Sequence, residues 1–92
     1  MNKNYYTGKN AIITGAGSGI GRSFTLQLAS MRTNLVISDI KLDRVEKLKS
    51  EIEPLGVKVI AMECDVTKNA AVKRMVKTSI EELGSLDFVF SN

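Results

Sequence analysis

The sequence contains one cysteine, one proline, no tryptophan and no histidine in 92 residues, and it has no long apolar run. Because Cys64 is alone, the chain cannot form an internal disulfide. The apolar runs are too short to span a bilayer, and the N-terminus lacks the apolar core of a signal peptide. With 43% hydrophobic and 25% charged residues, the composition is that of a globular chain. We therefore expect one cytoplasmic domain without membrane contact.

A net charge of +3 and a pI near 9.2 raise the question of nucleic-acid binding. The basic residues are interleaved with acids, as in the stretch 41–47, which is typical of solvated helix faces. No aromatic residue is interleaved with the densest basic group, which consists of Lys68, Lys73, Arg74 and Lys77. We therefore expect no nucleic-acid partner.

Apolar stretches alternate with amphipathic segments along the chain. Helices are predicted at about 20–31, 43–53 and 68–83, and strands at 11–13, 35–38, 57–62 and 86–90. Thr33 with Asn34 is expected to end the first helix, Pro54 with Gly56 to end the second, and Thr67 to cap the third. The helical residues predicted to face the core are Ile20, Phe24, Leu28, Met31, Val45, Leu48, Ile52, Leu55, Val72, Met75, Val76, Ile80 and Leu83.

This alternation demands a parallel sheet with helices on both faces. We predict an α/β fold, a Rossmann-like doubly wound parallel sheet whose four strands lie in the order 3-2-1-4. The order reverses between the first and fourth strands, so a crevice should open there, at the carboxyl ends of the strands. Gly15, Asp39, Asp65 and Asn92 are expected to converge on it.

A glycine-rich run, residues 14–21, follows the first apolar strand and opens the first helix. This arrangement lets backbone amides approach a phosphate, and the helix N-terminus adds about half a positive charge. The spacing matches neither G-x-G-x-x-G from any start nor the Walker loop, whose first glycine and lysine are both missing. Phosphoryl transfer is therefore disfavoured.

The run fits T-G-x-x-x-G-x-G through Thr14, Gly15, Gly19 and Gly21, and it resembles the cofactor loop of the short-chain dehydrogenase/reductase family. Asp39 ends the second strand eighteen residues beyond Gly21, close to where dinucleotide folds place an acid for the adenosine ribose.

Two further places in the chain resemble the same family. Asp65 and Val66 are similar to the family's Asp-Val pair beside the adenine ring. Ser91 and Asn92 resemble the start of its Asn-Asn-Ala-Gly element, with serine replacing the first asparagine.

The resemblance implies a partial NAD-binding Rossmann domain over residues 1–92, from an NAD-dependent oxidoreductase that moves a hydride between NAD and an alcohol or carbonyl substrate. It covers only the cofactor-binding half of the family fold, so the chain is interpreted as a truncated N-terminal part. The family's catalytic serine, tyrosine and lysine have no counterpart here, and we expect the isolated chain to be inactive. A full-length form is expected to take a small-molecule substrate and to be a homo-oligomer. A standalone, non-catalytic nucleotide-binding or regulatory module is the alternative.

The cofactor is expected to be NAD rather than NADP. Asp39 would accept hydrogen bonds from the ribose hydroxyls of NAD and repel the 2′-phosphate of NADP. Ser18 and Ile40 stand where NADP-using relatives often carry basic residues, although Lys41 lies close by. No metal site is expected. The expected cofactor-binding residues are Gly15, Gly17, Ser18, Gly19, Ile20, Gly21, Asp39, Asp65, Val66 and Asn92.

Tyr5 and Lys9 match the family's catalytic Y-x-x-x-K spacing but precede the first strand. That spacing works when both residues share one helix face, and Gly8 argues against such a helix. In a parallel fold the pair would also lie at the end of the strand opposite the glycine loop. We therefore assign them no catalytic role.

Overall fold

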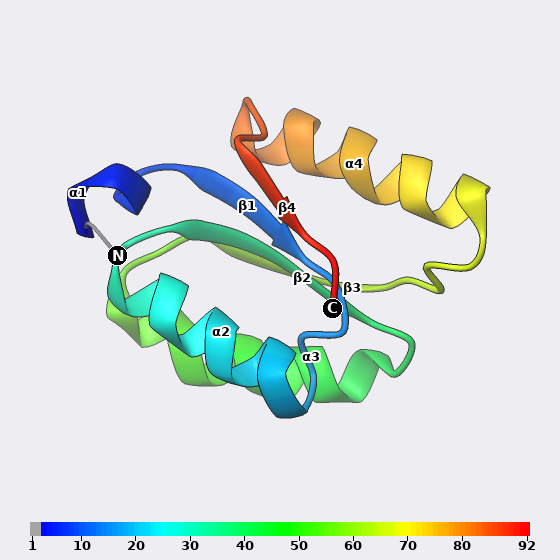
Figure 1. Ribbon diagram of the computed structural model, residues 1–92, viewed down its shortest axis with the longest axis horizontal. Coiled ribbons are helices and arrows are strands. Elements are labelled where there is room, and N and C mark those ends of the chain that lie inside the picture. The colour runs from blue at the N-terminus through cyan, green and yellow to red at the C-terminus, as the bar shows by residue number, and fades with distance from the viewer. Residues whose placement is uncertain (1–2) are drawn as a thin grey trace.

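Four short apolar segments pair as a parallel sheet in the computed structural model, which describes residues 3–92 (Figure 1). The strands are β1 (Asn10–Ile13), β2 (Asn34–Asp39), β3 (Val59–Glu63) and β4 (Phe88–Phe90), and they lie in the order β3-β2-β1-β4. The helices are α1 (Lys3–Tyr6), α2 (Gly19–Ser30), α3 (Leu42–Ile52) and α4 (Asn69–Leu83), with a short 3-10 turn η1 (Glu53–Leu55). The expected fold class and strand order are confirmed.

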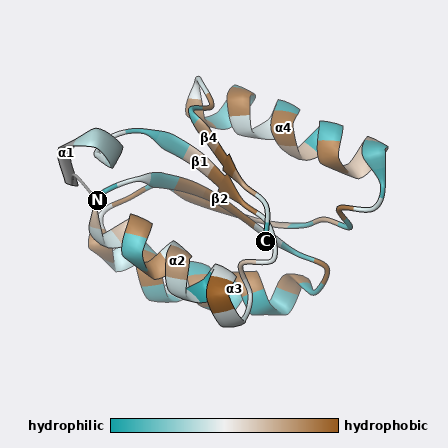
Figure 2. Ribbon diagram, in the orientation of Figure 1, coloured by the Kyte–Doolittle hydropathy of each residue, from teal (hydrophilic) through white to brown (hydrophobic). Residues whose placement is uncertain are grey.

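Helices cover both faces of the sheet: α2 and α3 lie on one side and α4 on the other (Figure 1). Alternate residues of a strand point to opposite faces, so Ala11 and Ile13 pack in the core beneath α2 and α3 while Ile12 packs beneath α4. The strands are apolar along most of their length because both of their faces are covered (Figure 2).

The helix faces differ in how completely they are buried. Val45, Leu48 and Ile52 of α3 are fully buried, as predicted, whereas Met75 is the one apolar residue of α4 buried to that degree among those expected to face the core. Ile80 on α4 and Leu55 after α3 are 47% and 43% exposed, so their predicted burial is wrong. Ile80 lies in the last turn of α4, which alone covers this face of the sheet.

Ile20 was expected in the core and is instead 80% exposed. It stands in the first turn of α2, where the neighbouring Gly21 is the buried residue, so this turn leaves Ile20 at the surface. The apolar side chains that α2 buries in the core lie further along the helix, at Leu28 and Ala29.

Two predicted helix ends are also wrong. Thr67 does not cap α4, because its hydroxyl donates to Asp65 at 2.6 Å and the helix begins two residues later with no side-chain cap. The first helix ends at Ser30, and the left-handed residue after it is Arg32, with φ 65°. Asn34 already belongs to β2, since its amide donates to the Lys9 carbonyl at 2.8 Å.

The bounds of two strands differ slightly from the predictions. The third strand begins at Val59 rather than Val57 and extends to Glu63, and the fourth begins at Phe88 rather than Leu86. No helix within residues 3–92 is long and apolar enough to cross a membrane.

A polar network joins the amino ends of the strands. The Asn10 side-chain amide donates to the carbonyl and the hydroxyl of Ser85, at 3.2 and 3.0 Å, and accepts from Asn34 at 3.0 Å. The Asn10 backbone amide donates to the Asp87 carboxylate at 2.9 Å, and the Asp87 amide donates back to the Asn10 carbonyl. Asn34 in turn accepts from the backbone amide of Lys58 at 3.1 Å. These bonds connect β1 to the segments that precede β3 and β4.

Replacing Asn10 by Ala should lower the free energy of unfolding by about 1–3 kcal/mol. Asn10 is only 6% exposed, so its hydrogen-bond partners Ser85 and Asn34 would lose a buried partner. Asn69→Ala is the matched control, because Asn69 is exposed and its side chain makes no hydrogen bond among the described residues; it should change stability by less than about 0.5 kcal/mol. Urea unfolding followed by circular dichroism measures both. Equal stability of the two variants would contradict this role for Asn10.

Candidate functional site

The glycine loop lies at the carboxyl ends of the strands, where the strand order reverses between β1 and β4. It joins β1 to α2, and its neighbours are the ends of β2, β3 and β4. In open α/β sheets ligands bind in the crevice at such a reversal. All four residues expected to converge there line one cleft of about 270 Å³: Gly15, Asp39, Asp65 and Asn92.

Asp39 fastens the middle of the loop. One carboxylate oxygen accepts from the backbone amide of Gly17 at 3.1 Å, and the other accepts from the backbone amide of Lys41, also at 3.1 Å. Its carbonyl accepts from the amide of Cys64 at 3.0 Å. Asp39 is 7% exposed, so this buried carboxylate is held by backbone donors and joins the loop to the end of β2 and the turn before α3.

Asn92 fastens the other side of the loop. Its side-chain amide donates to the Gly15 carbonyl at 3.1 Å, and its backbone amide donates to the Thr14 hydroxyl at 3.1 Å. The Thr14 amide continues the pairing by donating to the Phe90 carbonyl at 3.0 Å. Thr14 is therefore part of the site's framework, although it was not among the expected binding residues.

The loop glycines differ in how much space a side chain would find at each position. A Cβ on Gly21 would overlap the Gly15 carbonyl oxygen, and one on Gly17 would lie 2.7 Å from an Asp39 carboxylate oxygen. Gly15 and Gly19 have φ of 61° and 59°, a left-handed conformation that favours glycine. Around Gly19 a Cβ would meet nothing within 4 Å, so the start of α2 is open to solvent beside a tightly packed loop.

The turn after β3 forms the far wall of the cleft. The Asp65 carboxylate accepts from the hydroxyl and the backbone amide of Thr67, at 2.6 and 3.0 Å. These two hydrogen bonds lower the pKa of Asp65 below its usual value. Val66 is 51% exposed, and the Cys64 thiol is buried, which raises its pKa. Ile40 and Thr67 also line the cleft, and only the folded structure brings them there.

Ile20 belongs to a second hollow, of about 300 Å³, on the β4 side of the loop. Its walls combine the start of α2 with the end of β4, including Phe24 and Val89. Gly21 and Asn92 line it too, and Asn92 thus borders both hollows. Ser18 precedes α2, is exposed and forms no side-chain cap.

Tyr5 and Lys9 lie away from the glycine loop. Tyr5 belongs to the four-residue helix α1, which ends before Lys9, so the two do not share a helix face. The Tyr5 ring packs against Phe88, 5.7 Å between centroids, at the amino end of β4.

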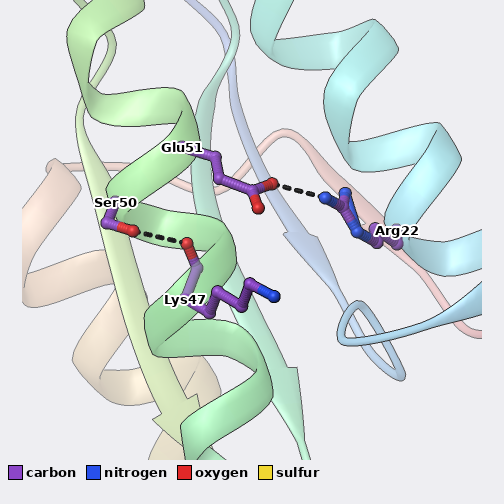
Figure 3. Close-up of polar contacts among 4 residues, drawn as sticks. All are labelled: Arg22, Lys47, Ser50 and Glu51. Carbon is purple, nitrogen blue, oxygen red and sulfur yellow. Dashed lines mark hydrogen bonds and ion pairs between the residues drawn. The ribbon is translucent and has the colours of Figure 1, made fainter.

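Arg22 is the basic residue that immediately follows the glycine run in the sequence. Its guanidinium forms an ion pair with Glu51 of α3 at 2.5 Å (Figure 3). The pair joins the start of α2 to the last turns of α3, so this cation is engaged with a carboxylate.

Residues 9–92 match the family model described as short chain dehydrogenase. The chain belongs to this family. It is 36% identical over 85 residues to 7alpha-hydroxysteroid dehydrogenase of Escherichia coli strain K12, covering 92% of the chain and 33% of that protein. It is 38% identical over 89 residues to cyclohexanol dehydrogenase of an Acinetobacter species, covering 97% and 36%.

Solved structures of the family share the fold. A hydroxysteroid dehydrogenase from Escherichia coli superposes with a TM-score of 0.90 at 36% identity, covering 95% of the chain and 37% of its own. A short chain dehydrogenase/reductase from Burkholderia phymatum, in complex with NAD, superposes with a TM-score of 0.88 at 31% identity, covering 97% and 31%. The chain thus spans about one third of the length of these relatives, so the family fold is present here only in part.

Gly21→Ala should destabilise the fold by about 1–3 kcal/mol, because the new methyl group would overlap the backbone oxygen of Gly15 and crowd the Asn92 amide. Ser18→Ala changes an exposed position of the same loop and should alter stability by less than about 0.5 kcal/mol. Thermal unfolding of both variants distinguishes them. A Gly21→Ala protein as stable as wild type would show that the packing is looser than described.

Proposed function

We propose that this chain is the dinucleotide-binding part of an NAD-dependent short-chain oxidoreductase. The observation that carries the proposal is the glycine loop fastened between Asp39 and Asn92, with the open side of Gly19 at the start of α2. Membership of the short-chain dehydrogenase family supports it. The NAD complex of the Burkholderia phymatum relative supports it further.

The residues present fit such a cofactor. The amides at the start of α2 have no side chain above Gly19 to block a pyrophosphate, and the helix N-terminus favours its negative charge. The Asp39 carboxylate would accept hydrogen bonds from the ribose hydroxyls, and the turn of Asp65 and Val66 would border the adenine. Gly15, Gly17, Ser18, Ile20 and Gly21 complete the proposed contacts around the loop, together with Asn92.

The bound nicotinamide would supply hydride transfer with an alcohol or carbonyl substrate. We assign no residue of this chain to proton transfer, and we propose that the 92-residue chain alone does not turn over substrate. A small-molecule substrate, homo-oligomeric assembly and cytoplasmic location are proposed for the full-length form.

Gly19→Val should weaken NAD binding about tenfold, on the scale of a lost charge-assisted hydrogen bond, because its side chain would stand over the start of α2. Gly84→Val is a matched control: Gly84 is also left-handed, with φ 89°, and a Cβ there also meets nothing within 4 Å. Gly84 ends α4, away from the loop. The Gly84→Val variant should therefore carry similar backbone strain and retain its affinity for NAD. Calorimetric titration measures both, with circular dichroism to verify folding. Equal loss of affinity in the two variants would count against the assignment of the loop.

The wild-type chain should bind NAD more tightly than NADP. The buried Asp39 carboxylate would repel a 2′-phosphate, and neither Ser18 nor Ile40 offers a positive charge to offset it. Parallel titrations at one salt concentration measure the preference. A lower dissociation constant for NADP would overturn it.

A further inference from the structure

Arg44 of α3 stands beside the carboxylate that is proposed to meet the adenosine ribose. A Cβ placed on Gly17 would lie 2.6 Å from the Arg44 Cβ and 2.7 Å from an Asp39 carboxylate oxygen. The base of the Arg44 side chain and the Asp39 carboxylate therefore adjoin the same point above the glycine loop. Arg44 follows Asp39 by five positions in the sequence, and the start of α3 brings them together.

The Arg44 guanidinium has no partner among the side chains that the structure describes. Arg44 is exposed, its backbone amide donates to the Lys41 carbonyl at 3.2 Å, and its side chain enters neither an ion pair nor a hydrogen bond with the residues that the structure describes. Both Asp39 carboxylate oxygens accept from backbone amides instead. The Arg44 guanidinium is thus not engaged by another described protein group, and the base of its side chain adjoins the loop.

Other cations near the loop are less suited to this role. Arg22 is paired with Glu51 (Figure 3). Lys41 contributes its backbone amide to Asp39, and the three atoms nearest to a Cβ on Gly17 belong to Arg44 and Asp39. Arginine also binds phosphate in a bidentate manner that lysine does not reproduce.

We infer that Arg44 is a specificity-determining residue of the proposed site, which attracts a 2′-phosphate on the adenosine ribose and so limits the preference for NAD that Asp39 creates. This inference rests on the proposed dinucleotide function. Asp39 disfavours the phosphate through like charge, and Arg44 offsets part of that repulsion from the adjoining helix. The ratio of NAD to NADP affinity is then set by this pair.

The test uses the 92-residue chain and the adenosine halves of the two cofactors, 5′-AMP and 2′,5′-ADP, which differ in the 2′-phosphate. Arg44→Gln should weaken 2′,5′-ADP binding about tenfold, on the scale of one charge-assisted hydrogen bond. It should change 5′-AMP binding by less than about twofold, as expected for an exposed substitution without a contact. Arg44→Lys should recover only part of the loss.

Lys47→Gln is the matched control, since it removes the same charge one turn further along α3, at an exposed position. It should leave the ratio of the two affinities within about twofold of wild type. If Arg44→Gln weakens both ligands equally, or neither, the inference is wrong. If the wild-type chain binds neither 5′-AMP nor NAD, the proposed function itself fails.

Discussion

The buried carboxylate of Asp39 is the constraint on which the candidate site depends. Its two oxygens accept from the backbone amides of Gly17 and Lys41, so one side chain fixes the glycine loop against the end of β2 and the start of α3. A buried carboxylate is costly unless it is hydrogen-bonded, and here the bonds are backbone amides whose positions the fold determines. The loop and the carboxylate therefore order each other.

The second fastening, at Asn92, makes the loop a bridge between neighbouring strands. Asp39 binds it from the β2 side, and Asn92 binds it from the β4 side. Gly21 packs beneath it so closely that no Cβ fits, whereas Gly19 remains open. This combination of a rigid frame and an unobstructed helix start is what an anion-binding backbone requires. It also explains why the glycines of one loop are not interchangeable.

Much of this arrangement could be predicted from the sequence because it follows from local signals. Alternating apolar and amphipathic segments imply a parallel sheet, and the position of Asp39 at the end of an apolar run placed it beside the loop. The positions of the wrongly predicted residues depend on contacts that the local sequence pattern does not encode. The Thr67 hydroxyl donates to Asp65 rather than capping the helix, and the first turn of α2 buries Gly21 and leaves Ile20 exposed. The Asn10 bonds reach residues more than seventy positions away.

The most direct test of the account is to map the backbone amide resonances of the 92-residue chain during a titration with NAD. If the fastened loop is the dinucleotide site, the shifts should concentrate at Gly17, Gly19 and Ile20 and at the turn after Asp65. Amides in the middle of α4, around Val76, should remain unchanged, because that helix covers the opposite face of the sheet. Saturable shifts centred on α4, with the glycine loop unaffected, would contradict the account.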